Sequence, residues 1–275
     1  MGRKVFFRML PQAFIEHINN IRCDWWKKAM TLVNDRKIDV AMRNGYLNFY
    51  RYGQSIAKVT WKSRTKKPSA EIHRKYFGEH INSYTRREPD DLFLSEKALN
   101  EVLTNAERHS GDEKKGCHHI AANHAACVID MEMGLPGLAL RFDMVAALSS
   151  GGGSRLTFFE AKHSENDALR ARNKKPTVLT QLEKYAHNLQ KQKEDILAGY
   201  VSAVNTAKRI EIRGGCLQAL AALAPESIEV DDQPRLVVFK PDQGARSLEE
   251  CWQNVLREKG VDLIYAEDAK NIVLQ

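Results

Sequence analysis

The alternation of apolar and polar positions predicts a β-hairpin near the middle of the chain. Residues 138–148 are mainly apolar, and residues 156–159 form a second run of β-prone residues. Positions 149–154 (SSGGGS) are typical of a turn, because glycine accepts the positive φ angles of tight connections. Two such runs joined by a short glycine-rich segment indicate a pair of antiparallel strands.

Apolar residues recur at intervals of three and four in other segments, which is the spacing of an amphipathic helix. We expect helices at residues 14–34, 92–108, 178–197 and 248–259, with Ser95 as the N-cap of the second, and mainly helical structure at 198–223. A further helix is expected within residues 111–133, beginning between Asp112 and Gly116 and ending at the Gly-Leu-Pro-Gly segment 134–137.

Further β-prone runs occupy residues 37–42, 46–51 and 55–61, with turns at Asn44-Gly45 and Gly53, and later residues 235–240 and 261–266. The first three runs predict a small antiparallel meander. Strands that alternate with helices in the later part predict an α/β sheet covered on both faces. A boundary near residues 88–91 divides the chain into an N-terminal α+β extension, residues 1–90, and a main domain, residues 91–275.

The charge is unevenly distributed along the chain. Its net value is +7, and residues 1–90 carry 19 Lys and Arg against 8 Asp and Glu. Such an excess favours a surface that meets a polyanion, and nucleic acid is the expected partner of residues 1–90. The alternative is a basic surface that serves only solubility.

Other compositional features exclude some protein classes. No window offers about 18 uninterrupted apolar residues, so we expect no transmembrane helix and no membrane partner. The basic N-terminus lacks an apolar core before Pro11 that is long enough for a secretory signal. The five cysteines show no C-x-x-C spacing, which favours reduced thiols and a cytoplasmic location.

The hairpin carries the candidate chemistry. Asp143 lies in its first strand, and Glu160 and Lys162 project from one face of the second, because side chains alternate along a strand. Two carboxylates and an ammonium that converge there suit metal-assisted phosphodiester hydrolysis, since carboxylate oxygens are hard ligands for Mg²⁺ or Mn²⁺. The alternative is a set of ordinary ion pairs, for example between Arg141 and Asp143.

These residues resemble the PD-(D/E)XK nuclease superfamily. The match is Phe142-Asp143 followed by Glu160-Ala161-Lys162, with Phe142 where the family often has proline. Downstream, Gln181 and Tyr185 resemble the Q-x-x-x-Y motif of its RecB-type and Cas4-like branch. The resemblance implies a restriction-endonuclease-like core, a mixed central sheet flanked by helices. It also implies Asp143, Glu160 and the carbonyl of Ala161 as ligands of Mg²⁺ or Mn²⁺, Lys162 as the catalytic lysine, and Gln181 and Tyr185 beside the site.

The family often adds an acid or a histidine from the helix before the Asp strand. Glu113, His118 and His119 are the candidates for this further metal ligand, and the sequence leaves the choice between them open. A different metal hydrolase is an alternative, with zinc held by Cys117, His118, His119 and His124. Their spacing fits no usual structural zinc site.

Several donors follow the proposed site in sequence. Arg170, Arg172, Lys174 and Lys175 are expected to hold the substrate strand through its phosphates. The alternative is a solvated basic loop.

The sequence therefore predicts a Mg²⁺-dependent deoxyribonuclease that acts on DNA rather than RNA. Phage defence, restriction or repair, with a protein partner or as a homo-oligomer, would suit such a chain. The rival prediction is a non-catalytic protein with a degenerate nuclease fold that binds nucleic acid or another protein.

Overall fold

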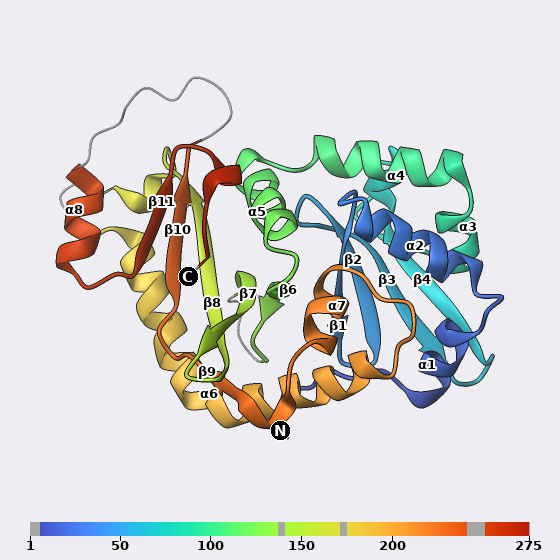
Figure 1. Cartoon of the computed structure of the whole chain (residues 1–275). Helices are drawn as coiled ribbons and strands as arrows, with labels where there is room; N and C mark the ends of the chain where they lie inside the picture. The colour runs from blue at the N-terminus through green and yellow to red at the C-terminus, as the bar shows by residue number, and fades with distance from the viewer. Residues whose placement is uncertain (1–5, 137–140, 171–174, 241–250, 275) are drawn as a thin grey trace, which may run out of the picture.

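The computed structural model describes residues 6–136, 141–170, 175–240 and 251–274. Two β-sheets lie side by side, the N-terminal one in blue to cyan in Figure 1 and the second in green to red. Helices pack against both sheets. The prediction of a mixed α/β protein is confirmed. No helix in the described residues is long and apolar enough to span a membrane.

The N-terminal sheet is an antiparallel meander in the order β1-β2-β3-β4-β5. The predicted strands are confirmed as β1 (Asp39–Arg43), β2 (Tyr46–Arg51) and β3 (Gln54–Lys62), with Gly45 and Gly53 at positive φ in the turns between them. The sheet has two further strands that were not predicted, β4 (Lys67–His73) and β5 (Tyr84–Arg87). The 3-10 turn η1 (Arg74–Phe77) lies between them in sequence.

Residues 14–34 form two helices, so the prediction of one continuous helix was wrong. These are α1 (Gln12–Asn19) and α2 (Asp24–Asn34). The break is local: the side-chain oxygen of Asn20 accepts the N–H of Arg22 at 2.9 Å, which competes with helical bonding. Ile21 lies at the break and is 81% exposed.

Two helices connect the sheets. α3 (Pro89–Phe93) is followed by α4 (Glu96–Arg108), and Ser95 caps α4 as predicted, its hydroxyl accepting the N–H of Ala98 at 3.3 Å. α4 begins after the predicted boundary at residue 90, yet it packs against β2, β3 and η1 of the N-terminal sheet. Residues 96–108 therefore pack as part of the N-terminal unit, although they follow the predicted boundary in sequence.

The second sheet is mixed, in the order β11-β10-β8-β7-β6. β6 (Val128–Gly134), β7 (Arg141–Ser150) and β8 (Gly153–His163) are antiparallel, whereas β10 (Arg235–Phe239) runs parallel to β8 and β11 (Leu263–Ala266) parallel to β10. The short β9 (Ile228–Val230) also pairs with β8 in parallel. The predicted hairpin and both predicted C-terminal strands are confirmed.

The predicted helix at residues 111–133 was right only in its first half. α5 (Asp112–Asn123) ends before Val128, where strand β6 begins. Residues 128–133 are buried and pair with β7. Pairing with a buried neighbour therefore overrides a helical spacing, because it satisfies the backbone and buries both faces of the segment.

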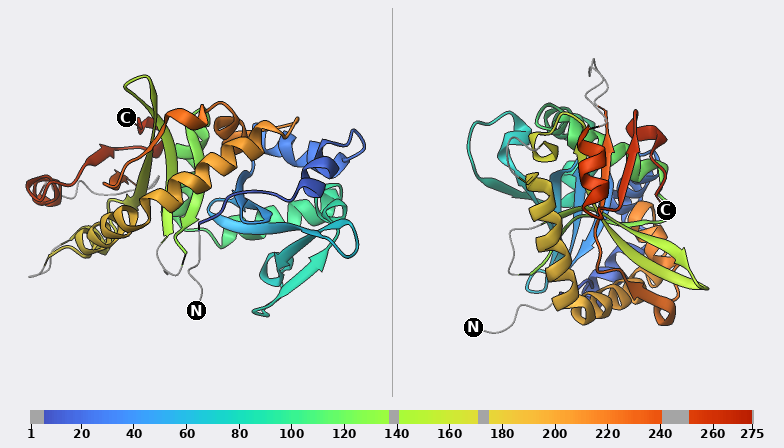
Figure 2. Two further views of the ribbon diagram at one scale, coloured as in Figure 1. Left: turned by 90° about the horizontal axis from the view of Figure 1, so that it is seen from below. Right: turned by 90° about the vertical axis from the view of Figure 1, so that its left-hand side faces the viewer.

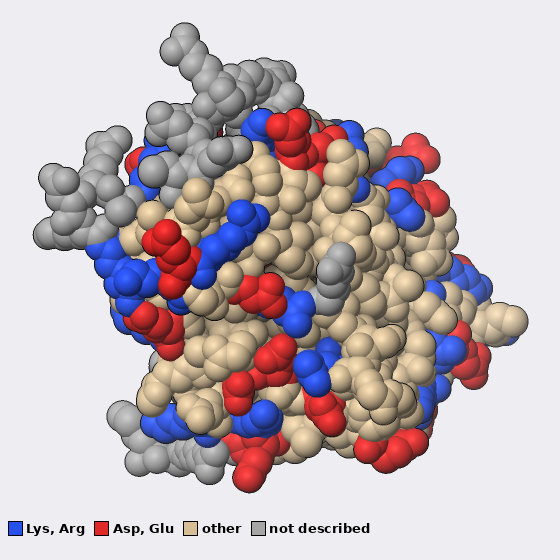
Figure 3. Space-filling view, turned by 60° about the vertical axis from the view of Figure 1, so that its left-hand side comes forward, with Lys and Arg blue, Asp and Glu red and all other residues tan. Residues whose placement is uncertain are grey.

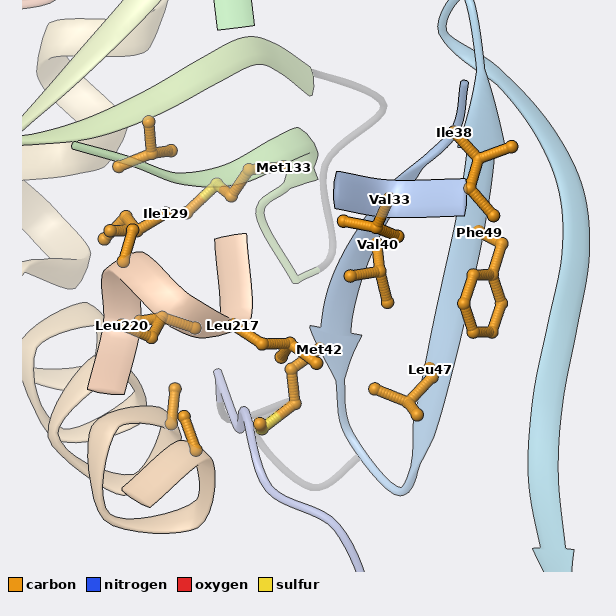
Figure 4. Close-up of a cluster of buried hydrophobic side chains, with 14 of the residues drawn as sticks. Val33, Ile38, Val40, Met42, Leu47, Phe49, Ile129, Met133, Leu217 and Leu220 are labelled. Atoms are coloured by element: carbon orange, nitrogen blue, oxygen red, sulfur yellow. The ribbon is translucent and has the colours of Figure 1, made fainter. Parts of the chain in front are cut away.

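The two sheets share one hydrophobic core. Figure 4 shows Val40 and Met42 of β1 facing Ile129 and Met133 of β6 across Leu217 and other side chains. The short helix α7 (Gly215–Ala221) lies at this junction and contacts both β1 and β6. The N-terminal unit is therefore packed onto the second sheet rather than tethered to it.

The long helix α6 (Thr177–Lys208) passes along the second sheet toward the N-terminal unit (Figure 2). Phe6 packs on it where Gly199 leaves room, and a Cβ at Gly199 would lie 2.4 Å from the Phe6 ring. The remaining elements are η2 (Asp167–Leu169), η3 (Pro225–Ser227), α8 (Cys251–Glu258) and η4 (Ala269–Asn271). Cys23, Cys117, Cys127 and Cys216 are all free thiols.

Candidate active site

Asp143 and Glu160 lie where β7 and β8 separate. The ladder between these strands ends at the pair Met144–Phe159, and these two residues are the sequence neighbours of Asp143 and Glu160. Beyond it, the N–H of Ala161 donates to Asp143 Oδ2 at 2.9 Å, while Ala161 stays paired with β10 on its other side. Both carboxylates are buried. The two buried carboxylates therefore lie together at the place where the strand pairing ends.

Lys162 links the Glu160 carboxylate to α5. Its ammonium bonds to the Glu160 carboxylate, lies 3.5 Å from Glu113 Oε1, and donates to the carbonyl of Ala161 at 3.2 Å. Glu113 is held from its other oxygen by the side-chain amide of Asn166 at 2.7 Å. Of the three candidates for the helix ligand, Glu113 is the one that contacts the predicted catalytic lysine.

Gln181 and Tyr185 reach the site from the first turns of α6. The amide of Gln181 donates to Glu160 Oε1 at 2.7 Å and to the Tyr185 hydroxyl at 2.9 Å. The Tyr185 hydroxyl donates in turn to the carbonyl of Arg141 at 2.7 Å. Because residues four apart share a face of a helix, the two side chains brace Glu160 and the start of β7 together.

Two residues at this site were not predicted from the sequence. Lys114 donates to Asp143 Oδ1 at 2.9 Å and also bonds to the carboxylate of Glu132. Glu132 lies between two residues of β6 that pair with Met144 and Phe142, which sets it opposite Asp143. Recognising residues 128–134 as a strand beside residues 141–150 would have revealed Glu132.

The backbone at Glu132 is strained, because its φ is +51° although it is not glycine. Such residues persist where the surroundings hold them, and they cluster at functional sites. Here the holding groups are charged: Lys114 bonds to the Glu132 carboxylate, and Arg141 Nη1 lies 3.6 Å from it.

Burial shapes the electrostatics of the site. It raises the pKa of Glu160 to about 7, with the charge of Asp143 adding to the effect and Lys162 opposing it. Burial would lower the pKa of Lys162, but Glu160 and Glu113 raise it above its ordinary value. Lys114 behaves likewise, because Asp143 and Glu132 outweigh its burial and raise its pKa. Both lysines are therefore cations at neutral pH.

The donor set fits a hard divalent cation. Glu160 Oε2 is buried and has no hydrogen-bond partner among the described residues, so one lone-pair-bearing oxygen is left for a ligand. The Asp143 carboxylate and the carbonyl of Ala161 are close by. Within the described ranges no three His, Cys, Asp or Glu side chains form a ready-made metal group. The ammoniums of Lys114 and Lys162 stand among the acids instead.

The predicted histidines lie elsewhere on α5. Both ring nitrogens of His118 are engaged, with Asp39 Oδ2 at 2.6 Å and the carbonyl of Arg36 at 3.1 Å, so it joins α5 to the N-terminal unit. His119 lines a small pocket with Phe239 and Lys240. The structure does not bring these side chains to Lys162 as it does Glu113.

The four side chains of the zinc alternative do not converge. Cys117 is buried in the apolar cluster between α5 and the second sheet. His124 accepts the N–H of Leu274 at 3.4 Å and contacts the carbonyl of Ile120 at 2.9 Å. With His118 bonded to Asp39, this set lacks the arrangement of a zinc site.

The predicted phosphate-binding residues are only partly described. Arg172 and Lys174 lie outside the described residues. Arg170 is half-buried after η2, and Lys175 pairs with Glu183 of α6. Lys175 also lines a groove of about 960 Å³ between α6 and α8, which has Leu179 and Pro234 in its walls and contains neither predicted carboxylate.

Acidic and basic side chains are interspersed on the face seen in Figure 3, without a broad area of one sign. Comparison of the chain with protein families, with curated proteins and with solved structures finds no match.

Proposed function

We propose that this protein is a divalent-cation-dependent nuclease with a restriction-endonuclease-like core formed by β6 to β11 and α5 to α6. One observation carries the proposal. Lys162 and Gln181 both bond to Glu160 at the point where β7 and β8 separate, and Asp143 is bonded there to the backbone N–H of Ala161, between Glu160 and Lys162. A buried, interconnected set of acids and a lysine is costly to assemble, so a catalytic role is favoured over chance.

Asp143, Glu160 and the carbonyl of Ala161 would hold the cation, Mg²⁺ or Mn²⁺, with Glu113 nearby as a further acid. When bound, such a cation supplies Lewis-acid activation of a water and of a phosphoryl oxygen. The buried Glu160 Oε2, which lacks a hydrogen-bond partner in the described part of the chain, supports this assignment.

Lys162 serves by its charge. Its pKa is raised by Glu160 and Glu113, so its ammonium keeps its protons at neutral pH and stabilises negative charge rather than accepting a proton. Gln181 orients Glu160 through the 2.7 Å bond to Oε1, and Tyr185 fixes Gln181 and the start of β7. These two residues act through Glu160 and are positioning residues.

The substrate proposed is nucleic acid, DNA rather than RNA. The excess of 19 basic over 8 acidic residues in positions 1–90 supports a polyanionic partner. The N-terminal unit contacts β6 and is bonded to α5 through Asp39 and His118, so it stands next to the elements that carry the acids. A role in defence, restriction or repair in the cytoplasm is part of the same proposal.

The test is a cleavage assay on supercoiled plasmid, short single-stranded DNA and RNA, each with Mg²⁺, Mn²⁺ or EDTA. The wild type is compared with Lys162→Met, which keeps the length of the side chain and removes its charge. We expect metal-dependent cutting of DNA that falls by at least about 100-fold in the variant. Equal cutting by both proteins would remove Lys162 from the mechanism.

One observation favours a second candidate, a non-catalytic nucleic-acid-binding protein. The ammoniums of Lys114 and Lys162 already neutralise the acids that a cation would need. Nucleic-acid binding that is unaffected by EDTA, with no cutting of any of the three polymers, would support this candidate instead.

A further inference from the structure

The ammonium of Lys114 lies between two buried carboxylates. Its ammonium donates to Asp143 Oδ1 at 2.9 Å and bonds to Glu132 across the strand pair. The side chains of these acids are only 8% and 6% exposed, whereas that of Lys114 is 30% exposed. Two nearly buried carboxylates thus share one ammonium that still has access to solvent.

The N-terminal sheet holds Lys114 in this place. Gly53, in the turn between β2 and β3, lies so close that a Cβ there would be 2.7 Å from Lys114 Cδ and 3.1 Å from Glu132 Oε1. Its φ of +66° also favours glycine. The tip of an N-terminal hairpin therefore forms one wall of the candidate active site, against the stem of Lys114.

An ammonium and a divalent cation compete for one carboxylate. Each oxygen of Asp143 accepts one hydrogen bond, Oδ2 from the backbone N–H of Ala161 and Oδ1 from the side chain of Lys114. Of these two donors only Lys114 is a charged side chain that can move away, so Oδ1 is the oxygen at which the competition occurs. A cation that binds Oδ1 must weaken or displace the bond from Lys114, because the two positive charges repel at that distance.

We propose that Lys114 is a built-in counter-cation. Its ammonium bonds to Asp143 and Glu132, and it must move away from Asp143 when a divalent cation binds. This inference rests on the proposed function and assigns a role to a residue outside the family-like motif. Lys114 keeps the acids neutralised and the hairpin tip seated while no cation is bound. Its removal should therefore make cation binding easier, not harder.

The test measures Mn²⁺ binding by isothermal titration calorimetry without nucleic acid, so that activity plays no part. Lys114→Met removes the charge and keeps the apolar stem, whereas Lys114→Arg keeps the charge. We expect Lys114→Met to bind Mn²⁺ about tenfold more tightly than the wild type, which corresponds to the loss of one charged hydrogen bond. Lys114→Arg should stay close to the wild type.

A second pair of variants leaves Lys114 in the chain. Gly53→Ala pushes on the stem of Lys114 and should tighten Mn²⁺ binding as well. Gly45→Ala is the matched control, because Gly45 also has a positive φ, +78°, but no atom lies within 4 Å of the position of a Cβ. It introduces the same kind of backbone strain without touching the site.

The outcomes separate this inference from the proposed function. Tighter binding in Lys114→Met and Gly53→Ala, with Gly45→Ala unchanged, supports the counter-cation. Wild-type protein that binds Mn²⁺ and cuts DNA, with Lys114→Met binding equally or more weakly, overturns the counter-cation and leaves the nuclease standing. No Mn²⁺ binding by either the wild type or Lys114→Met overturns both.

Discussion

The backbone N–H of Ala161 donates to the carboxylate of Asp143 over 2.9 Å, from one strand of a hairpin to the other. The bond stands where the β7–β8 ladder has ended, so a side chain takes over from the backbone in holding the strands. It also fixes one oxygen of Asp143 and leaves the other to Lys114. The site therefore lies where the Asp143 carboxylate replaces a backbone carbonyl as the acceptor of the Ala161 N–H.

Removal of the amide of Gln181 should weaken the site without damaging the fold. Gln181→Ala takes away the 2.7 Å bond to Glu160, and we expect cation affinity or cleavage to fall about 10- to 100-fold, as for other outer partners of metal ligands. Gln190→Ala, at an exposed position of the same helix, is the control and should leave both unchanged. An unchanged Mn²⁺ titration in Gln181→Ala would contradict the positioning role.

Much of this arrangement could be predicted from the sequence, because it depends on local pattern. The hairpin follows from two apolar runs around SSGGGS, and the shared helix face of Gln181 and Tyr185 follows from their spacing in α6. Their place beside the hairpin was implied by the family resemblance alone. The hydrogen bonds of Gln181 to Glu160 and to Tyr185 agree with the predicted neighbourhood. The catalytic role of these residues stays a prediction.

The parts that were missed depend on contacts between distant segments. Residues 128–134 have apolar spacing that suits a helix, and only pairing with β7 makes them a strand. Glu132 was therefore overlooked. Lys114 was overlooked because its partners come from two other strands, and the turn at Gly53 that holds it comes from the N-terminal sheet. No local pattern encodes such a meeting.

Tyr185 should contribute to stability through its hydroxyl. Tyr185→Phe removes the 2.7 Å bond to the carbonyl of Arg141, and we expect the free energy of unfolding to fall by about 1 kcal/mol. Thermal unfolding measures this as a decrease in Tm of a few degrees. Tyr84→Phe, at an exposed tyrosine, should not shift Tm; a stable Tyr185→Phe variant would show that the hydroxyl bond does not contribute.

The stability of the protein should depend on pH through Glu160. Burial raises its pKa in the folded chain to about 7, above the ordinary value of 4.5, so the folded state binds this proton more strongly than the unfolded state. The contribution of this group to the free energy of unfolding is therefore fully present below pH 4.5 and is lost as the pH rises through 7. We expect a loss on the order of 1–3 kcal/mol that is absent in Glu160→Gln.

Urea unfolding of both proteins at pH 5 and pH 8 checks this expectation. The wild type should lose more stability between the two values than Glu160→Gln does. The same pKa predicts that metal-dependent cleavage rises as the pH passes through 7, because only the ionised carboxylate is a good ligand. Identical pH dependence of unfolding in the two proteins would argue against a raised pKa for Glu160.

A buried ionic cluster joins the N-terminal unit to the second sheet. Asp130 accepts from Arg8 Nε at 3.3 Å and from the Tyr200 hydroxyl at 3.0 Å, and it pairs with Arg43 of β1. Asp130→Ala would leave two buried guanidinium groups without their acid. We expect a loss of about 3–5 kcal/mol in the free energy of unfolding.

Asp232→Ala is the control for this cluster, because Asp232 pairs with Lys193 on the surface at 3.4 Å, and such pairs contribute less than about 1 kcal/mol. Urea unfolding compares the two variants. A similar small effect of both substitutions would mean that the Asp130 cluster does not hold the two sheets together.

The measurement that tests the central claim most directly is the single-turnover cleavage rate of plasmid DNA in Mg²⁺ by the wild type, Asp143→Asn and Glu160→Gln. Both substitutions keep the size of the side chain and remove its charge. Glu229→Gln is the control, because Glu229 lies exposed on the short strand β9. We predict that both site variants lose more than about 100-fold in rate while the control keeps the wild-type rate. Cleavage at the wild-type rate by Asp143→Asn and Glu160→Gln would contradict the account.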